Sequence, residues 1–299
     1  MQTLYSIEST GQEMGSEAAQ AALLQNIEQS RSLFTFLVHF IAEMARFSEK
    51  DAAKRAQKHL PTASDLNTNT KIAGNELVAA ILENPSYQKS LDHFHLRTAM
   101  DDDLVKRQYQ LLKESGEYRE YIQLASRDKK SERKIVEYIF THLILTNESF
   151  TGALEERYMN WEDDAEMMIV LMNGLLQKPA TFNFGEIAGA EKMTFATELL
   201  QCVLDKQELC GELIRPRLKN WDPERIAALD MILMRMGVCE FLFFETIPPK
   251  VTINEYIDLA KEYSTEQSGH FVNGILDNIH KDLLAQDKIH KRNFKNSTL

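Results

Sequence analysis

One stretch in the last third of the chain decides the fold. Residues 222–247 read DPERIAALDMILMRMGVCEFLFFETI, and residues 248–279 read PPKVTINEYIDLAKEYSTEQSGHFVNGILDNI. Apolar residues recur there every three or four positions, which is typical of helices that bury one face. The two prolines that open the second segment cannot continue the helix that ends near Phe244. Because Ser264 or Thr265 can cap the last segment, the stretch predicts three helices separated by a proline stop and a capped turn.

Two positions in this stretch carry local predictions. Asp222 can cap the first helix, with Pro223 in its first turn, where the missing N–H costs nothing. Gly274 lies inside the last helix, where glycine costs about 1 kcal/mol relative to alanine. We therefore expect a close helix–helix contact at Gly274.

Composition extends the helical prediction to the whole chain. The 299 residues include only 12 Gly and 7 Pro, about half the usual proportion. No segment shows sustained alternation of apolar and polar residues, so we predict no sheet and an all-α fold. Helical periodicity is clearest in residues 33–44, 104–113, 135–145, 193–204 and 226–244, whereas residues 64–70 and 179–189 indicate breaks.

Residues 135–161 and 195–221 align without a gap, and the two segments end in Trp161 and Trp221. The apolar positions match, but any two amphipathic helices would match about as well. The alignment is compatible with a diverged repeat and with two unrelated pairs of stacked helices.

The charge balance argues against a protein that coats nucleic acid by bulk positive charge. The chain has 34 Lys and Arg and 45 Asp and Glu, for a net charge of −11. Residues 211–299 carry 12 basic and 13 acidic residues, a net charge of 12 − 13 = −1. A polyanion is therefore repelled least by this last third.

The sequence contains no motif of a catalytic or cofactor-binding site. Glycine-rich phosphate loops, nucleophile elbows and zinc-binding helix motifs are all missing. His93 and His95 are spaced badly for a shared metal on a helix, and no cysteine lies near them. The acidic runs at 101–103 and 162–164 are better explained as helix starts than as acid–base or metal sites. We predict no enzyme activity, no cofactor and no metal.

The cysteines and the N-terminus indicate an ordinary cytoplasmic protein. Cys202, Cys210 and Cys239 form no metal or redox motif, so we interpret them as small apolar helix residues. The chain does not begin with a signal-peptide pattern. Its most apolar early stretch, residues 33–42, is much shorter than the roughly 20 residues that span a bilayer. We expect a soluble, cytoplasmic protein without membrane contact.

The decisive stretch closely resembles the NusB family of transcription antitermination factors. That family's signature reads P-x-K-V-x-I-N-E-x-I-x-L-A-K, then S-x-x-S-x-x-F-V-N-G-x-L-D, and residues 248–277 match it at nearly every defined position. The spacing of Asp230 and Arg235 also fits the family. Residues 2–6, Gln-Thr-Leu-Tyr-Ser, resemble the Q-x-L-Y-S piece of the family's first helix.

The resemblance implies a fold and a domain organisation. Family members consist of two small helical bundles, so we expect NusB-like bundles with a large additional helical region inserted after the first helix. On this basis, residues 1–10 are the first family helix and 11–190 a helical insertion of unassigned role. Residues 191–285 are the RNA- and partner-binding domain, and 286–299 a basic, flexible tail.

The resemblance also implies a function. Family members act without catalysis: they pair with NusE, a small-subunit ribosomal protein, and bind the boxA element of nascent ribosomal RNA. The complex joins the elongating RNA polymerase with other Nus factors and suppresses premature termination. NusB-like domains also precede RNA cytosine methyltransferase domains, but only 22 residues follow Asp277 here. A remaining alternative is a protein-only scaffold that has lost direct RNA binding.

The family's functional positions map onto seven residues of this sequence. The resemblance assigns RNA contacts to Gln2, Tyr5, Arg235, Lys250, His270 and Phe271. It places Asp230 at the NusE interface. Each position also has an ordinary interpretation as a core or solvated helix residue.

The sequence departs from the family at its N-terminus and in its charge. The family's arginine-rich stretch, which contacts RNA, does not precede the Q-x-L-Y-S piece, so we expect translation to begin upstream. The acidic region 11–190 could also screen the RNA-binding face. If RNA binding depends steeply on salt, the basic segment 288–295 becomes a further candidate.

Overall fold

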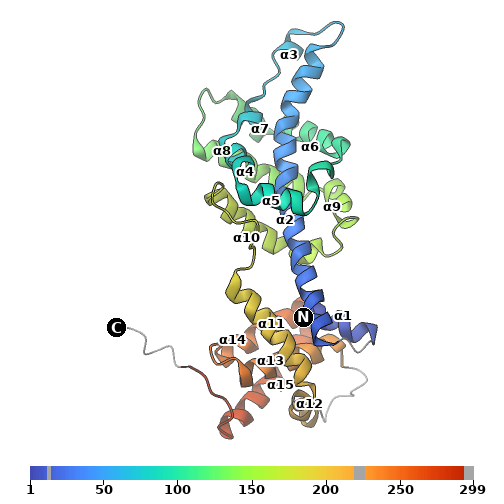
Figure 1. Ribbon diagram of the computed structural model, residues 1–299, viewed down its shortest axis with the longest axis vertical. Helices are drawn as coiled ribbons and strands as arrows, with labels where there is room; N and C mark the ends of the chain where they lie inside the picture. Colours follow the sequence, from blue (N-terminus) through green and yellow to red (C-terminus); the bar gives the residue numbers. More distant parts are fainter. Residues whose placement is uncertain (12–14, 219–225, 293–299) are drawn as a thin grey trace, which may run out of the picture. The chain divides into compact units, whose positions relative to one another are not determined.

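The computed structural model describes residues 1–11, 15–218 and 226–292 (Figure 1). Within these ranges the chain forms helices, turns and connecting segments and no strand, so the all-α prediction is confirmed. The chain divides into two compact units. Unit 1 comprises Met1–Gln25 and Ala188–Leu299, and unit 2 comprises Asn26–Ile187.

Unit 1 contains both ends of the chain. Its helices are α1 (Gln2–Thr10), α11 (Ala190–Asp205), α12 (Gln207–Ile214), the short 3₁₀ turn η4 (Arg215–Arg217), α13 (Ala228–Phe243), α14 (Pro249–Tyr263) and α15 (Glu266–Ala285). The boundary between the units falls within α2 (Ser16–Ala56), 41 residues long. The proposed cap Asp222, the adjacent Pro223 and the repeat's Trp221 lie outside the described residues.

The core of unit 1 forms where α13, α14 and α15 pack against one another. Helix α13 is apolar nearly all round, and ten of its residues are buried. The helix boundaries follow the sequence signals: α13 ends before the proline pair, and the Thr265 hydroxyl accepts a hydrogen bond from the Ser268 amide, 3.1 Å away. The three predicted helices of the decisive stretch are therefore present.

The expected helix contact at Gly274 is wrong. A Cβ atom there would meet nothing within 4 Å, and the residue is exposed. The close approach occurs instead at Gly237 of α13, where a Cβ atom would lie 2.9 Å from the Leu276 side chain. The missing side chain of Gly237 lets α13 and α15 approach, whereas Gly274 faces outward.

Unit 2 is built mainly from short helices. After α2 they are α3 (Ala63–Leu66), η1 (Lys71–Gly74), α4 (Glu76–Glu83), α5 (Pro85–His93), η2 (Leu96–Thr98), α6 (Asp102–Glu114), α7 (Gly116–Gln123), α8 (Lys129–Tyr138), the π-helical segment η3 (Ile139–Leu145), α9 (Glu148–Glu155) and α10 (Trp161–Gln177). Their shared core is rich in aromatic side chains, including Phe34, Phe40, Tyr87 and Phe184.

The loop predicted at residues 64–70 is partly helical. Thr62 accepts a hydrogen bond from the Asp65 amide, and the Asp65 carboxylate accepts one from the Thr62 amide. This reciprocal capping box starts the single turn of α3. The acidic run at 101–103 does start a helix, because Asp101 caps α6 through the Asp103 and Leu104 amides.

No helix in the described part of the chain is long and apolar enough to cross a membrane. The helix boundaries of α8 to α9 recur about sixty residues later as α11 and α12. The first pair belongs to unit 2 and the second to unit 1, so the aligned segments contribute to different cores.

Candidate functional site

The outward face of α1 presents two of the predicted RNA-binding residues. Leu4 and Ile7, three residues apart, are buried in the core of unit 1. Gln2 and Tyr5 lie on the other side of the helix, and Tyr5 is 49% exposed. A half-exposed tyrosine offers a flat surface on which a base can stack.

Arg235 connects α13 to α1. Its guanidinium forms an ion pair and a hydrogen bond with the Glu8 carboxylate, and both side chains are partly buried. This pairing holds the short α1, which is under three turns long, against α13. The pairing also neutralises the positive charge of Arg235, which the family resemblance assigns to RNA binding.

Lys250 and His270 are solvent-accessible cationic candidates. Lys250 lies in the first turn of α14 and His270 in the first turns of α15, and both are exposed. Neither forms an ion pair within the part of the chain that the structure describes. Their side chains can therefore reach a phosphate without first breaking an internal bridge.

Phe271 and Asp230 are buried in unit 1. Phe271 is only 8% exposed and belongs to the core cluster. Asp230 is 5% exposed, and burial raises the pKa of its carboxyl group, while the hydroxyls of Ser268 and Ser264 lower it in part. Among the described atoms, the Asp230 Oδ1 oxygen accepts no hydrogen bond. Both residues offer little surface to a ligand.

A second buried carboxylate, on Glu240, ties α13 to α14. It accepts hydrogen bonds from the Tyr256 hydroxyl at 2.5 Å and the Thr252 hydroxyl at 2.7 Å. Burial raises the pKa of Glu240, and the two hydroxyl donors partly offset this. Glu240 was not among the residues predicted from the sequence, although a glutamate inside an apolar helix run is a visible signal.

Part of the basic C-terminal segment binds the end of α13. The Lys291 ammonium group donates to the carbonyls of Glu240 and Phe244, at 2.7 Å each. Arg292 pairs with the Glu245 carboxylate at 3.1 Å. A lysine near the last carbonyls of a helix is stabilising, because it donates to carbonyl oxygens that have no partner within the helix and its charge interacts favourably with the helix dipole. The expected basic residue at 295 lies outside the described residues.

The three cysteines converge although they are far apart in sequence. The Cys210 and Cys239 sulfurs are 3.6 Å apart and buried, and Cys202 interacts with Cys239. The cysteines are free thiols. No group of three or more His, Cys, Asp or Glu residues in the described ranges is arranged to hold a metal.

Unit 1 is thus an all-α module that displays Gln2, Tyr5, Lys250 and His270, engages Arg235 internally and buries Phe271 and Asp230. The sequence model of the NusB family matches residues 175–281. This range includes α11 to α14 and most of α15.

Individual relatives support the same assignment. The chain is 45% identical over 97 residues to the transcription antitermination protein NusB of Salinibacter ruber, covering 32% of this chain and 61% of that protein. It is 42% identical over 98 residues to the NusB protein of Desulfatibacillum aliphaticivorans, covering 33% of this chain and 68% of the relative. No solved structure matches.

The chain belongs to the NusB family. It spans between half and about two thirds of the length of the curated relatives it matches. The matched stretch accounts for about a third of the chain, so most of unit 2 lies outside it.

Proposed function

We propose that this protein is a non-catalytic, RNA-binding transcription antitermination factor of the bacterial cytoplasm. In this proposal it pairs with NusE, binds boxA RNA of nascent ribosomal RNA and, through other Nus factors, helps RNA polymerase avoid premature termination. One observation carries the proposal: the family match coincides with α11 to α15, which form a module with its own core. Residues 11–190 are then an insertion into the family fold.

The exposed candidates suit contact with a single RNA strand. Tyr5 supplies a stacking surface, and one stacked base is worth about 1–3 kcal/mol. Lys250 and protonated His270 can neutralise phosphates, and Gln2 can hydrogen-bond to a base or ribose. Two or three phosphate contacts to a single strand give a salt dependence with a log–log slope of only about −1.4 to −2.1.

Phe271 and Asp230 require a different account if they act in binding. Stacking at Phe271 predicts that Phe271→Ala weakens RNA binding about 5- to 150-fold while the protein stays folded. Its burial predicts a loss of about 3–5 kcal/mol of stability for the same change. Measuring both quantities on Phe271→Ala separates the two roles. The corresponding test for Asp230 measures NusE binding by the Asp230→Asn variant. This substitution removes the charge and keeps the shape of the side chain.

A second candidate function is a protein-only scaffold of the transcription complex. The Arg235–Glu8 ion pair favours it, because a positive charge assigned to RNA is already neutralised inside the protein. The net charge of −11 also favours the scaffold, because an acidic protein repels a polyanion such as RNA. On this account the module binds NusE and contacts RNA weakly or through NusE alone.

An RNA gel shift with the full chain separates the two functions. The RNA-binding proposal predicts a shift of boxA RNA that NusE strengthens and that Lys250→Glu weakens. Lys192→Glu is the matched control, because Lys192 is also exposed and outside the predicted contacts. NusE binding with no shift of boxA RNA, with or without NusE, would establish the scaffold instead.

A further inference from the structure

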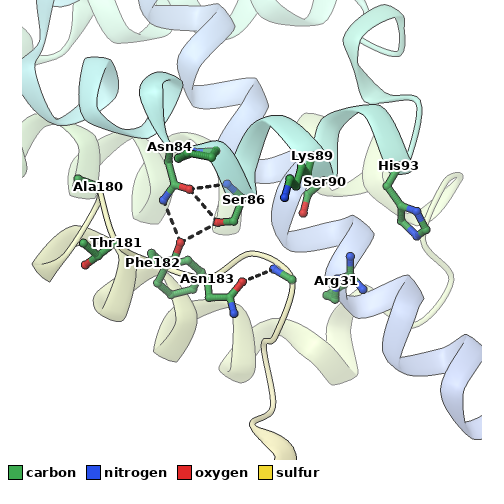
Figure 2. A pocket seen from close by; sticks show the side chains of 12 residues that line it. Arg31, Asn84, Ser86, Lys89, Ser90, His93, Ala180, Thr181, Phe182 and Asn183 are labelled. Atoms are coloured by element: carbon green, nitrogen blue, oxygen red, sulfur yellow. Dashed lines mark hydrogen bonds between the residues drawn. The ribbon is translucent and has the colours of Figure 1, made fainter.

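An open pocket of about 780 Å³ lies in unit 2. Its lining residues from α2 and α5 lie outside the region that matches the family, whereas those from residues 180–185 lie inside it. Its walls come from α2, from α5 and from the segment between α10 and α11 (Figure 2). The described residues that line it include Arg31, Asn84, Ser86, Lys89, His93 and Phe182.

Hydrogen bonds that are buried or partly buried hold the pocket wall in place. Asn84 caps α5 through the Ser86 and Tyr87 amides, and its own amide donates to the carbonyls of Pro179 and Phe182 at 2.9 Å each. The Phe184 amide donates to the Ser86 hydroxyl at 3.1 Å. Figure 2 shows the part of this network that joins Asn84, Ser86 and the Phe182 carbonyl. A wall fixed before the ligand arrives reduces the ordering cost of binding.

The pocket is basic in a protein that is acidic overall. Arg31, Lys89 and His93 line it, and none of its described lining residues carries a carboxylate. Glu28, nearby, pairs with Arg31 and with His93, the latter at 3.2 Å. Lys89 is exposed and forms no ion pair with any residue the structure describes. One glutamate therefore opposes three basic groups, and Lys89 is left to bind an anion.

The remaining lining groups indicate a ligand that is larger than an inorganic anion and partly apolar. Pro85, Ala180 and the Phe182 ring provide apolar surface beside the basic groups. The side-chain oxygen of Asn183 accepts a hydrogen bond from the Gly185 backbone amide at 2.9 Å. The side-chain amide nitrogen of Asn183 is left as a donor for a ligand. Pockets for small organic ligands usually measure about 300–1,000 Å³, far more than one phosphate fills. The combination suits a phosphate attached to a flat ring.

We propose that this pocket binds a nucleotide through its phosphate. Lys89, with Arg31 and His93, holds the phosphate by charge-assisted hydrogen bonds. The apolar wall and Asn183 receive the base. The nucleotide is either a free molecule or one unit of a single RNA strand. This inference concerns unit 2 and does not rest on the function proposed for unit 1.

Calorimetric titration of the full chain tests the proposal with three probes: adenosine 5′-monophosphate, adenosine and a short single-stranded RNA. We expect the monophosphate or the RNA to bind, and adenosine to bind at least about tenfold more weakly. Lys89→Glu should weaken the bound probe at least about tenfold. Lys130→Glu, at a lysine of α8 that is also exposed and does not line the pocket, should leave binding within about twofold.

The probes also distinguish a free nucleotide from a nucleotide unit of an RNA strand. Binding of the monophosphate alone identifies a free nucleotide, and competition between the RNA and the monophosphate identifies a strand. Circular dichroism of both variants verifies that their helices are intact. The proposal is overturned if neither phosphate-bearing probe binds, or if Lys89→Glu and Lys130→Glu bind equally well.

Discussion

The two units stabilise their helices by different means. In unit 2, helices α3 to α9 each start at a residue whose side chain accepts a hydrogen bond from the first turn. In unit 1, α15 has such a cap, whereas α1, α11, α12, α13 and α14 have none. Helices of eight to thirteen residues are marginal on their own, and each cap is worth about 0.5–2 kcal/mol. Unit 2 should therefore be sensitive to polar changes at helix starts, and unit 1 to changes in packing.

The largest expected effect follows from loss of a buried cap in unit 2. Asn84→Ala removes the α5 cap and leaves the Pro179 and Phe182 carbonyls without this donor. We expect the free energy of unfolding to fall by about 2–4 kcal/mol. Urea unfolding followed by Trp161 fluorescence, in a Trp221→Phe background, measures it. Asn173→Ala, an exposed asparagine of α10, is the control. A loss below about 1 kcal/mol would contradict the role given to the caps.

The packing of unit 1 predicts opposite effects at two glycines. Gly237→Ala places a methyl group against the fully buried Leu276, so stability should fall by about 1–3 kcal/mol. Gly274→Ala meets open space in a helix, so stability should rise by up to about 1 kcal/mol. Calorimetric melting of both variants checks the signs. Equal effects at the two positions would mean that the α13–α15 contact does not limit the packing.

Burial of Glu240 predicts a pH dependence specific to unit 1. Its pKa is raised above the ordinary value of 4.5, so the folded state binds the proton more tightly than the unfolded state. This contribution to stability is fully present below pH 4.5 and is lost as the pH rises through the raised pKa. Glu240→Gln should therefore gain stability relative to the parent protein as the pH increases toward neutrality.

Denaturation curves at several pH values measure this trend. Glu262→Gln, at an exposed glutamate of α14 that is not among the groups acting on the Glu240 carboxyl, is the control. A stability difference between Glu240→Gln and the parent that is constant with pH would show that Glu240 does not titrate differently in the two states.

The smallest effect concerns the ion pair that ties α1 to α13. Glu8→Gln releases the Arg235 guanidinium. If Arg235 then contacts RNA, affinity for boxA RNA should rise about fivefold, and the salt slope should steepen by about 0.7. Glu262→Gln serves as the control here as well. Unchanged affinity would mean that Arg235 only holds α1 in place.

The sequence predicted unit 1 well because its helix signals are chemical and local. As expected, α13 ends before the proline pair that precedes Lys250, and Thr265 caps the start of α15. Leu4 and Ile7 are buried as their spacing predicts. Comparable signals in unit 2, such as Asn84 followed by Pro85, were present in the sequence and could have located α5 without the structure.

Pairings between distant residues could not be predicted in the same way. The Glu8–Arg235 ion pair joins residues 227 positions apart, and the basic pocket joins Arg31 to a segment near residue 182. The expected contact at Gly274 failed for the same reason, since spacing indicates a helix but not which face meets a neighbour. Likewise, a family motif identified Asp230 and Phe271, but only the packing shows that both are buried.

The central claim is that unit 1 binds RNA through its exposed face. Ultraviolet cross-linking of boxA RNA to the full chain with NusE, followed by mass spectrometry of the peptides, tests it most directly. The account predicts cross-links in the peptide that contains Tyr5 and in peptides from residues 250–271. RNA cross-linked to NusE or to residues 26–187, with none in unit 1, would contradict it.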